Sequence, residues 1–70
     1  MVMYYFEYET EKLSQEFDNL NTAICFAIMD RENETGQFIT IQDDLGNIIL
    51  DKENFQEIYE EFTVYLSGWL

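Results

Sequence analysis

The most informative chemical groups in this sequence are four carboxylates in its last third, named the acidic row: Glu53, Glu57, Glu60 and Glu61. Their spacing places them on one side of a helix, away from its apolar residues. Residues four apart on a helix lie roughly 6 Å apart along its axis, a spacing comparable with that of successive phosphates on one DNA strand. Lys52 precedes the row, and no basic residue follows to offset its charge. The row therefore predicts a contact surface for a basic partner, with a solvated helix face as the alternative.

Other acidic residues could enlarge this surface. Asp43, Asp44 and Asp51 lie just before the helix and could extend the row onto a neighbouring hairpin. A second acidic group near the N-terminus consists of Glu7, Glu9, Glu11, Glu16 and Asp18. We predict that the three aspartates, together with Glu7 and Glu9, contribute to binding the same partner.

The balance of charge also favours a basic partner. The chain of 70 residues has 15 Asp and Glu against three Lys and Arg and no His, for a formal net charge of -12. A small domain needs a net charge of only about 2–8 in magnitude for solubility, and an excess destabilises the compact state by self-repulsion. Such a surface repels nucleic acids and anionic membranes and attracts lysine- and arginine-rich surfaces. We expect no direct contact with nucleic acid or membrane. A halophile-style surface that only keeps the protein soluble is the alternative.

No catalytic group can be identified. Cys25 lies in the apolar run of residues 23–27, and the chain has no His to act as its base. Cys25 is therefore predicted to be a buried structural residue. Fifteen acids form accidental carboxylate pairs, and a chain of this length leaves little room for a sugar cleft. We expect no enzymatic activity and no catalytic residue.

A metal site is not expected either. Asp30, Glu32 and Glu34 alternate like the first ligands of a calcium-binding loop. Such a loop needs Gly at its sixth position and Glu at its twelfth, where this chain has Thr35 and Ile41. We therefore interpret residues 30–36 as a polar turn and expect no metal and no cofactor.

The elements that must position these side chains belong to a single domain, residues 1–70. With 47% hydrophobic and 17% aromatic residues, the chain is too apolar for a disordered acidic tail. Residues 2–9 alternate large apolar side chains with others, which predicts a strand. Thr10 could cap a short helix over residues 11–20, where Leu13 and Phe17 recur at helical spacing.

Residues 22–30 fit either a helix or a strand. The apolar run of residues 23–29 could continue the preceding helical stripe, or it could form a buried central strand after a break at Asn21 and Thr22. We favour the strand because the run is continuously apolar.

The second half of the chain has clearer signals. Residues 38–42 and 48–50 are predicted strands, and a turn at residues 45–47 joins them, with Gly46 supplying the conformation that a hairpin requires. Asp51 or Glu53 is expected to open a C-terminal helix. Its apolar stripe consists of Phe55, Ile58, Phe62, Tyr65 and Trp69. The expected fold class is α+β, with a small antiparallel sheet packed against this amphipathic helix.

Signals for cellular location are few. The apolar run of residues 23–29 is too short to span a bilayer, and the N-terminal residues lack the basic segment of a secretory signal. The chain has one cysteine, so it has no disulfide framework. These features favour the cytoplasm.

In size, charge and aromatic content, the chain resembles the small acidic DNA-mimic proteins of bacteriophages, most of all Bacillus-phage inhibitors of the nucleoid protein HU. The resemblance covers the whole chain and rests on bulk character, since DNA mimics share charge rather than sequence. It implies a phage-encoded protein in the host cytoplasm that binds the DNA-binding surface of HU and blocks its DNA binding.

Other acidic proteins have similar composition. They include inhibitors of CRISPR effectors, restriction enzymes and uracil-DNA glycosylase, and immunity proteins or antitoxins that neutralise a basic toxin. The small size and the many aromatic residues are also compatible with a homodimer.

Overall fold

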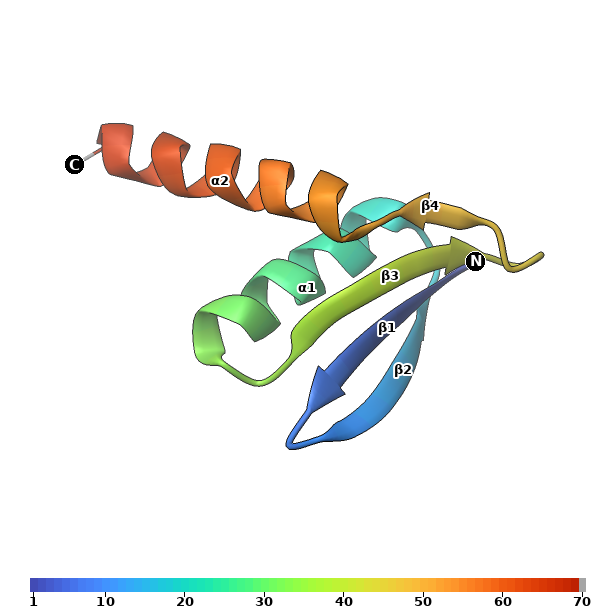
Figure 1. The fold of residues 1–70 in the computed structure, drawn as a ribbon. Helices are drawn as coiled ribbons and strands as arrows, with labels where there is room; N and C mark the ends of the chain where they lie inside the picture. The colour runs from blue at the N-terminus through green and yellow to red at the C-terminus, as the bar shows by residue number, and fades with distance from the viewer. Residues whose placement is uncertain (70) are drawn as a thin grey trace.

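The computed structural model describes residues 1–69 and the side chains of residues 1–64. Within this part of the chain, four strands and two helices follow one another (Figure 1): β1 (Val2–Tyr8), β2 (Glu11–Phe17), α1 (Leu20–Asn33), β3 (Gln37–Asp43), β4 (Ile48–Leu50) and α2 (Lys52–Trp69). The strands form one antiparallel sheet in the order β2-β1-β3-β4. The C-terminal helix packs on this sheet, which confirms the predicted α+β class.

The predicted helix over residues 11–20 is wrong, because residues 11–17 form β2. Glu9 and Thr10 both have positive φ, 51° and 68°, and make the two-residue loop of a tight hairpin. Thr10 is thus a turn residue rather than a helix cap. The spacing of Leu13 and Phe17 could not reveal this, since residues four apart share a face in a strand as well as in a helix.

The strand that we favoured for residues 23–29 is also wrong, because these residues lie in α1. Asn19 caps the helix, and its side-chain oxygen accepts a hydrogen bond of 2.9 Å from the Thr22 backbone N–H. Helix α1 continues to Asn33, so the predicted turn over residues 30–36 is confined to residues 34–36. Cys25 was predicted to be buried and is instead exposed on the outer side of α1.

The second half of the chain follows the prediction closely. Gly46 has a φ of 84° in the loop between β3 and β4. Asp51 opens α2, where its carboxylate accepts a hydrogen bond of 2.8 Å from the Asn54 backbone N–H. Tyr65 and Trp69 fall on the helical backbone, but their side chains lie outside the described residues.

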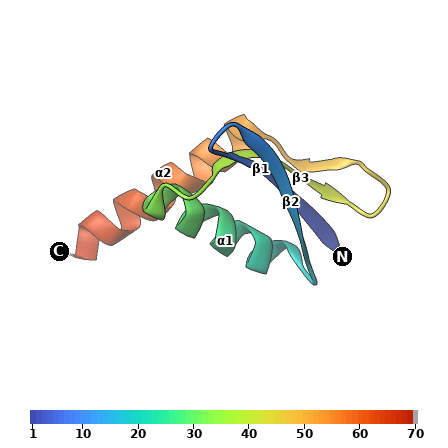
Figure 2. The ribbon, with the colours of Figure 1, turned by 90° about the horizontal axis from the view of Figure 1, so that it is seen from below.

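Aromatic side chains connect the sheet to both helices. Tyr4 of β1 is 1% exposed at the centre of a core that includes Ala23 and Ala27 of α1. Phe38 of β3 stacks on Phe55 of α2, with ring centroids 4.3 Å apart. Figure 2 shows α1 across one side of the sheet, with α2 extending past it toward the C-terminus. The small alanines allow α1 to approach the sheet closely, and Phe55 anchors the first turn of α2.

Candidate acidic contact surface

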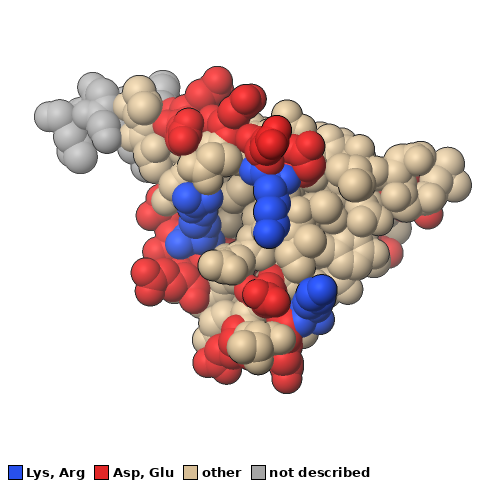
Figure 3. Space-filling model, viewed as in Figure 1, with Lys and Arg blue, Asp and Glu red and all other residues tan. Residues whose placement is uncertain are grey.

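Helix α2 presents the acidic row on its exposed side. Phe55 is 2% exposed, and Ile58 and Phe62 pack against the core, so this side of the helix faces the rest of the domain. The four glutamates of the row are all exposed. They span roughly 100° of the helix circumference and about 12 Å along its axis. In Figure 3, acidic side chains gather along α2, above the basic side chains on the same face.

The row ends on an apolar side chain. Val64 is 70% exposed and follows Glu57, Glu60 and Glu61 at helical spacing. The four residues line a shallow depression on the surface of α2. A partner's lysine or arginine could rest its aliphatic stem on Val64 while its charged group meets the carboxylates.

A polar clasp joins α1 to α2 beside the row, and its four members are Arg31, Glu32, Gln56 and Tyr59. The Tyr59 hydroxyl donates a hydrogen bond of 2.7 Å to Glu32 Oε1, and this bond is the main reason why the pKa of Tyr59 is raised. The Arg31 guanidinium carbon lies 4.2 Å from the centroid of the Tyr59 ring. Arg31 Nη1 also donates a hydrogen bond of 2.6 Å to Gln56 Oε1.

The clasp reaches the acidic row directly. Gln56 Nε2 donates a hydrogen bond of 3.2 Å to Glu60 Oε1. Glu32 is therefore an acidic residue next to the row that was not predicted to belong to it. It was missed because residues 30–36 were interpreted as a turn, and a helix through Glu32 would have been needed to bring it toward α2.

Asp43 ends β3 and Asp44 begins the loop between β3 and β4, which lies away from the free end of α2 (Figure 1). The Asp43 carboxylate accepts hydrogen bonds from the backbone N–H groups of Leu45 and Asn47, both of 2.9 Å. The Asn47 side chain donates a further hydrogen bond to this carboxylate. The backbone and side-chain hydrogen bonds from Asn47 are the main reason why the pKa of Asp43 lies below its usual range. Asp44 lies 3.5 Å from the N-terminal ammonium, the only ion pair among the described residues. Asp43 thus shapes the loop, as Asp51 caps α2.

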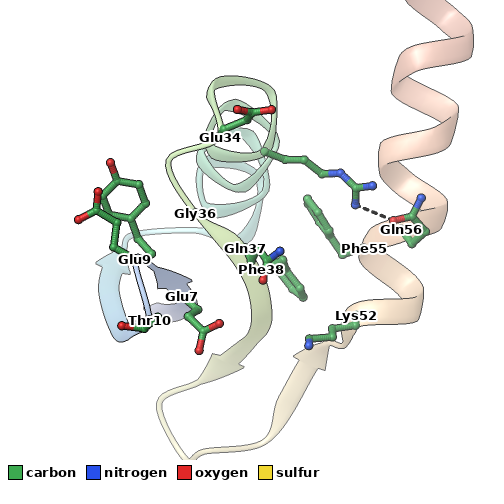
Figure 4. Close-up of a pocket in the computed structure, with 12 residues that line it drawn as sticks. Glu7, Glu9, Thr10, Glu34, Gly36, Gln37, Phe38, Lys52, Phe55 and Gln56 are labelled. Atoms are coloured by element: carbon green, nitrogen blue, oxygen red, sulfur yellow. Dashed lines mark hydrogen bonds between the residues drawn. The ribbon is translucent and has the colours of Figure 1, made fainter.

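Glu7, near the end of β1, and Glu9, in the hairpin loop after it, lie on the far side of a groove from α2 (Figure 4). Lys52 extends into this groove from the start of α2, and Arg31 also lines it. Two of the three basic residues of the chain are therefore in the groove, and the third, Lys12, is paired opposite Glu7 in the sheet. Local cations reduce the negative potential around Glu7 and Glu9, in contrast to the acidic row.

The structure thus brings the four glutamates of the row together and adds Glu32 beside them. It places the other predicted contact residues elsewhere: Asp43 at the end of β3 and Asp44 in the loop after it, Asp51 at the start of α2, Glu7 in β1 and Glu9 in the hairpin loop that follows β1. No group of three or more Cys, Asp or Glu side chains in the described structure is arranged to hold a metal ion. Across the same residues, no helix is long and apolar enough to cross a membrane.

Comparison with protein-family models, with curated proteins and with solved structures finds no match to this chain.

Proposed function

We propose that this protein is a DNA mimic, phage-encoded as its resemblance implies, that binds the basic DNA-binding surface of a host protein through the acidic row and blocks DNA binding. The observation that carries the proposal is the row itself: four exposed carboxylates on one side of α2, none of them paired with a Lys or Arg in the described structure. Their repulsion costs roughly 0.2–0.5 kcal/mol for each pair at helical spacing. A basic partner would offset that cost.

The mechanism follows from the electrostatics of DNA-binding proteins. These proteins concentrate Lys and Arg where phosphates sit, and their affinity for DNA depends strongly on salt. Carboxylates held at phosphate-like spacing can bind the same Lys and Arg side chains, and the negative field of the chain would accelerate association with the partner. Packing of Phe55 against Phe38 holds α2 on the folded domain, so the row need not be ordered again on binding.

The proposed partner is the nucleoid protein HU in the host cytoplasm. The test is competition: HU bound to fluorescent DNA is titrated with the wild-type protein at low and at high salt. We expect displacement of DNA at low salt and a steep loss of affinity as salt rises. If HU leaves its DNA bound at every salt concentration, HU is not the partner. The next test is then affinity capture of a partner from host lysate, carried out with and without competing DNA.

Two variants with the same charge change locate the contact. Changing the four glutamates of the row to Gln should weaken binding at least tenfold, a change that corresponds to about 1.4 kcal/mol. The matched control changes Glu9, Glu11 and Glu16 to Gln and Asp18 to Asn, and should keep most of the affinity. Equal losses in the two variants would show that net charge acts alone. Capture of a basic toxin that does not bind DNA would instead favour an immunity protein or antitoxin.

We also propose that the protein can pair with a second copy of itself. The supporting observation is the outer side of α1, where Phe26 and Met29 are 41% and 55% exposed within the continuously apolar run of residues 23–29.

A further inference from the structure

The acidic row stands on a helix that is held at one end. Phe55 and Phe62 mark the stretch of α2 whose side chains pack on the core, and Val64 beyond it is largely exposed. Figure 1 shows the remaining turns of α2 extending away from the sheet. Apolar contacts tolerate small rotations, because they are not directional. A hydrogen bond loses strength when its angle or length changes, so polar contacts define a helix orientation more sharply.

The polar clasp supplies contacts of this kind between α1 and α2. Its hydrogen bond from Tyr59 to Glu32 joins side chains 27 positions apart in the sequence. Arg31 lies over the same ring and also contacts Gln56, one turn earlier on α2. The clasp also uses Arg31, one of only three basic residues in the chain, although Arg31 is exposed.

We infer that Tyr59 and Glu32 are positioning residues, whose hydrogen bond sets the orientation in which α2 presents the acidic row to its partner. The inference rests on the proposed function for its effect on binding. Its structural half, that the clasp orients α2, can be tested without any partner. Glu32 is exposed, so its alternative role is that of one more surface charge.

The first experiment measures the orientation of α2 in the free protein. Cys25 is exposed on α1 and is the only cysteine, and Val64→Cys adds a second exposed site on α2. Nitroxide labels at the two positions report the distance between the helices. We expect a narrow distance distribution in the otherwise unchanged protein, and a broader or shifted one with Tyr59→Phe or Glu32→Ala. Unchanged distributions in both variants, with helicity retained, would overturn the inference.

The second experiment separates position from charge. Glu32→Gln and Glu32→Ala remove the same charge, but only Gln can still accept the hydrogen bond from Tyr59. We expect Glu32→Ala to bind HU, or the basic partner found in its place, roughly fivefold more weakly than Glu32→Gln. Tyr59→Phe, which changes no charge, should lose a similar factor. Equal affinities of the two Glu32 variants, with Tyr59→Phe unaffected, would assign Glu32 a charge role alone and overturn the inference.

The two experiments fail in different ways. If the distances respond to the clasp variants but the wild-type protein binds no basic partner, the orienting role of the clasp stands and the proposed function fails. If the wild-type protein binds and the distances do not respond, the proposed function stands and the positioning role fails.

Discussion

At the scale of single residues, one buried phenol ties the centre of the sheet to α1. The Tyr4 hydroxyl donates a hydrogen bond of 3.0 Å to Asp30 Oδ2, while Thr35 donates one of 2.8 Å to the other carboxylate oxygen. Burial, followed by the negative charge of Asp30 and this hydrogen bond, raises the pKa of Tyr4 well above its ordinary value. The carboxylate of Asp30 is thus partly buried and accepts two hydrogen bonds, which sets it apart from the exposed glutamates of α2.

This raised pKa predicts that the protein loses stability in alkali. Above pH 10 the unfolded chain releases the Tyr4 proton while the folded chain keeps it, so the free energy of unfolding falls as pH rises. Tyr4→Phe removes the titrating group. It should cost about 1 kcal/mol near neutral pH, because Asp30 loses a donor, and it should flatten the alkaline decline. Urea unfolding between pH 7 and 11 measures both effects.

The control for this prediction is Tyr5→Phe. Tyr5 lies on the opposite side of β1 from Tyr4, so its removal leaves the hydrogen bond to Asp30 in place. We expect this variant to retain the alkaline decline of the wild type. An equal flattening in both variants would show that the decline does not arise from Tyr4.

At the scale of elements, we expect removal of one negative charge to have opposite effects on stability at the end of β3 and on α2. Glu57→Gln relieves repulsion with Glu53 and Glu61, so it should raise the free energy of unfolding by about 0.2–0.5 kcal/mol for each relieved pair. Asp43→Ala also removes one negative charge, but it deletes the acceptor of the loop N–H groups and should lower the melting temperature. Thermal unfolding followed by circular dichroism compares the two. Shifts of the same sign would show that net charge, and not local structure, controls stability.

How much of the fold can be predicted depends on whether a segment has one dominant period. Alternation over residues 2–9 and the stripe through Phe55, Ile58 and Phe62 each fit a single element. The strand forms over residues 2–8, one residue shorter than predicted, and the stripe packs on the core as predicted. Residues 11–17 have apolar side chains four apart, which fit a strand or a helix equally. The run of residues 23–29 has no period at all, because apolar residues occupy the outer side of α1 as well as its buried side.

The candidate site also has a part that the sequence predicts and a part that it does not. The row on α2 follows from helical spacing alone, since a periodic stripe determines which side of a helix faces solvent. Sequence could not show that Asp43 and Asp51 accept backbone hydrogen bonds, because carboxylates are suited both to capping backbone N–H groups and to binding a basic partner. The position of Glu32 beside α2 could not be predicted for another reason, because it depends on the tertiary packing of two helices.

At the scale of the whole molecule, the few cations of the chain make no ion pair with its main acidic surface among the described residues. Arg31 and Lys52 line the groove beside β1, and Lys12 lies opposite Glu7, so none of them offsets the charge of the acidic row by an ion pair in the described structure. The molecule is elongated, with principal extents of 40 × 25 × 20 Å. The row lies on the exposed side of the packed stretch of α2, where a large partner can reach it.

The proposed self-association should respond to salt in the opposite direction from partner binding. Each copy carries a formal charge of -12, so two copies repel each other and salt should strengthen their pairing, whereas salt weakens binding to a basic partner. Analytical ultracentrifugation at several protein and salt concentrations measures the mass. Met29→Gln places a polar group on the outer side of α1 and should shift the equilibrium toward monomer. Leu45→Gln, a matched change at an 86% exposed loop position, should leave it unaltered. A wild-type protein that stays monomeric under all these conditions would rule out the α1 pairing, because high salt removes the repulsion that opposes it.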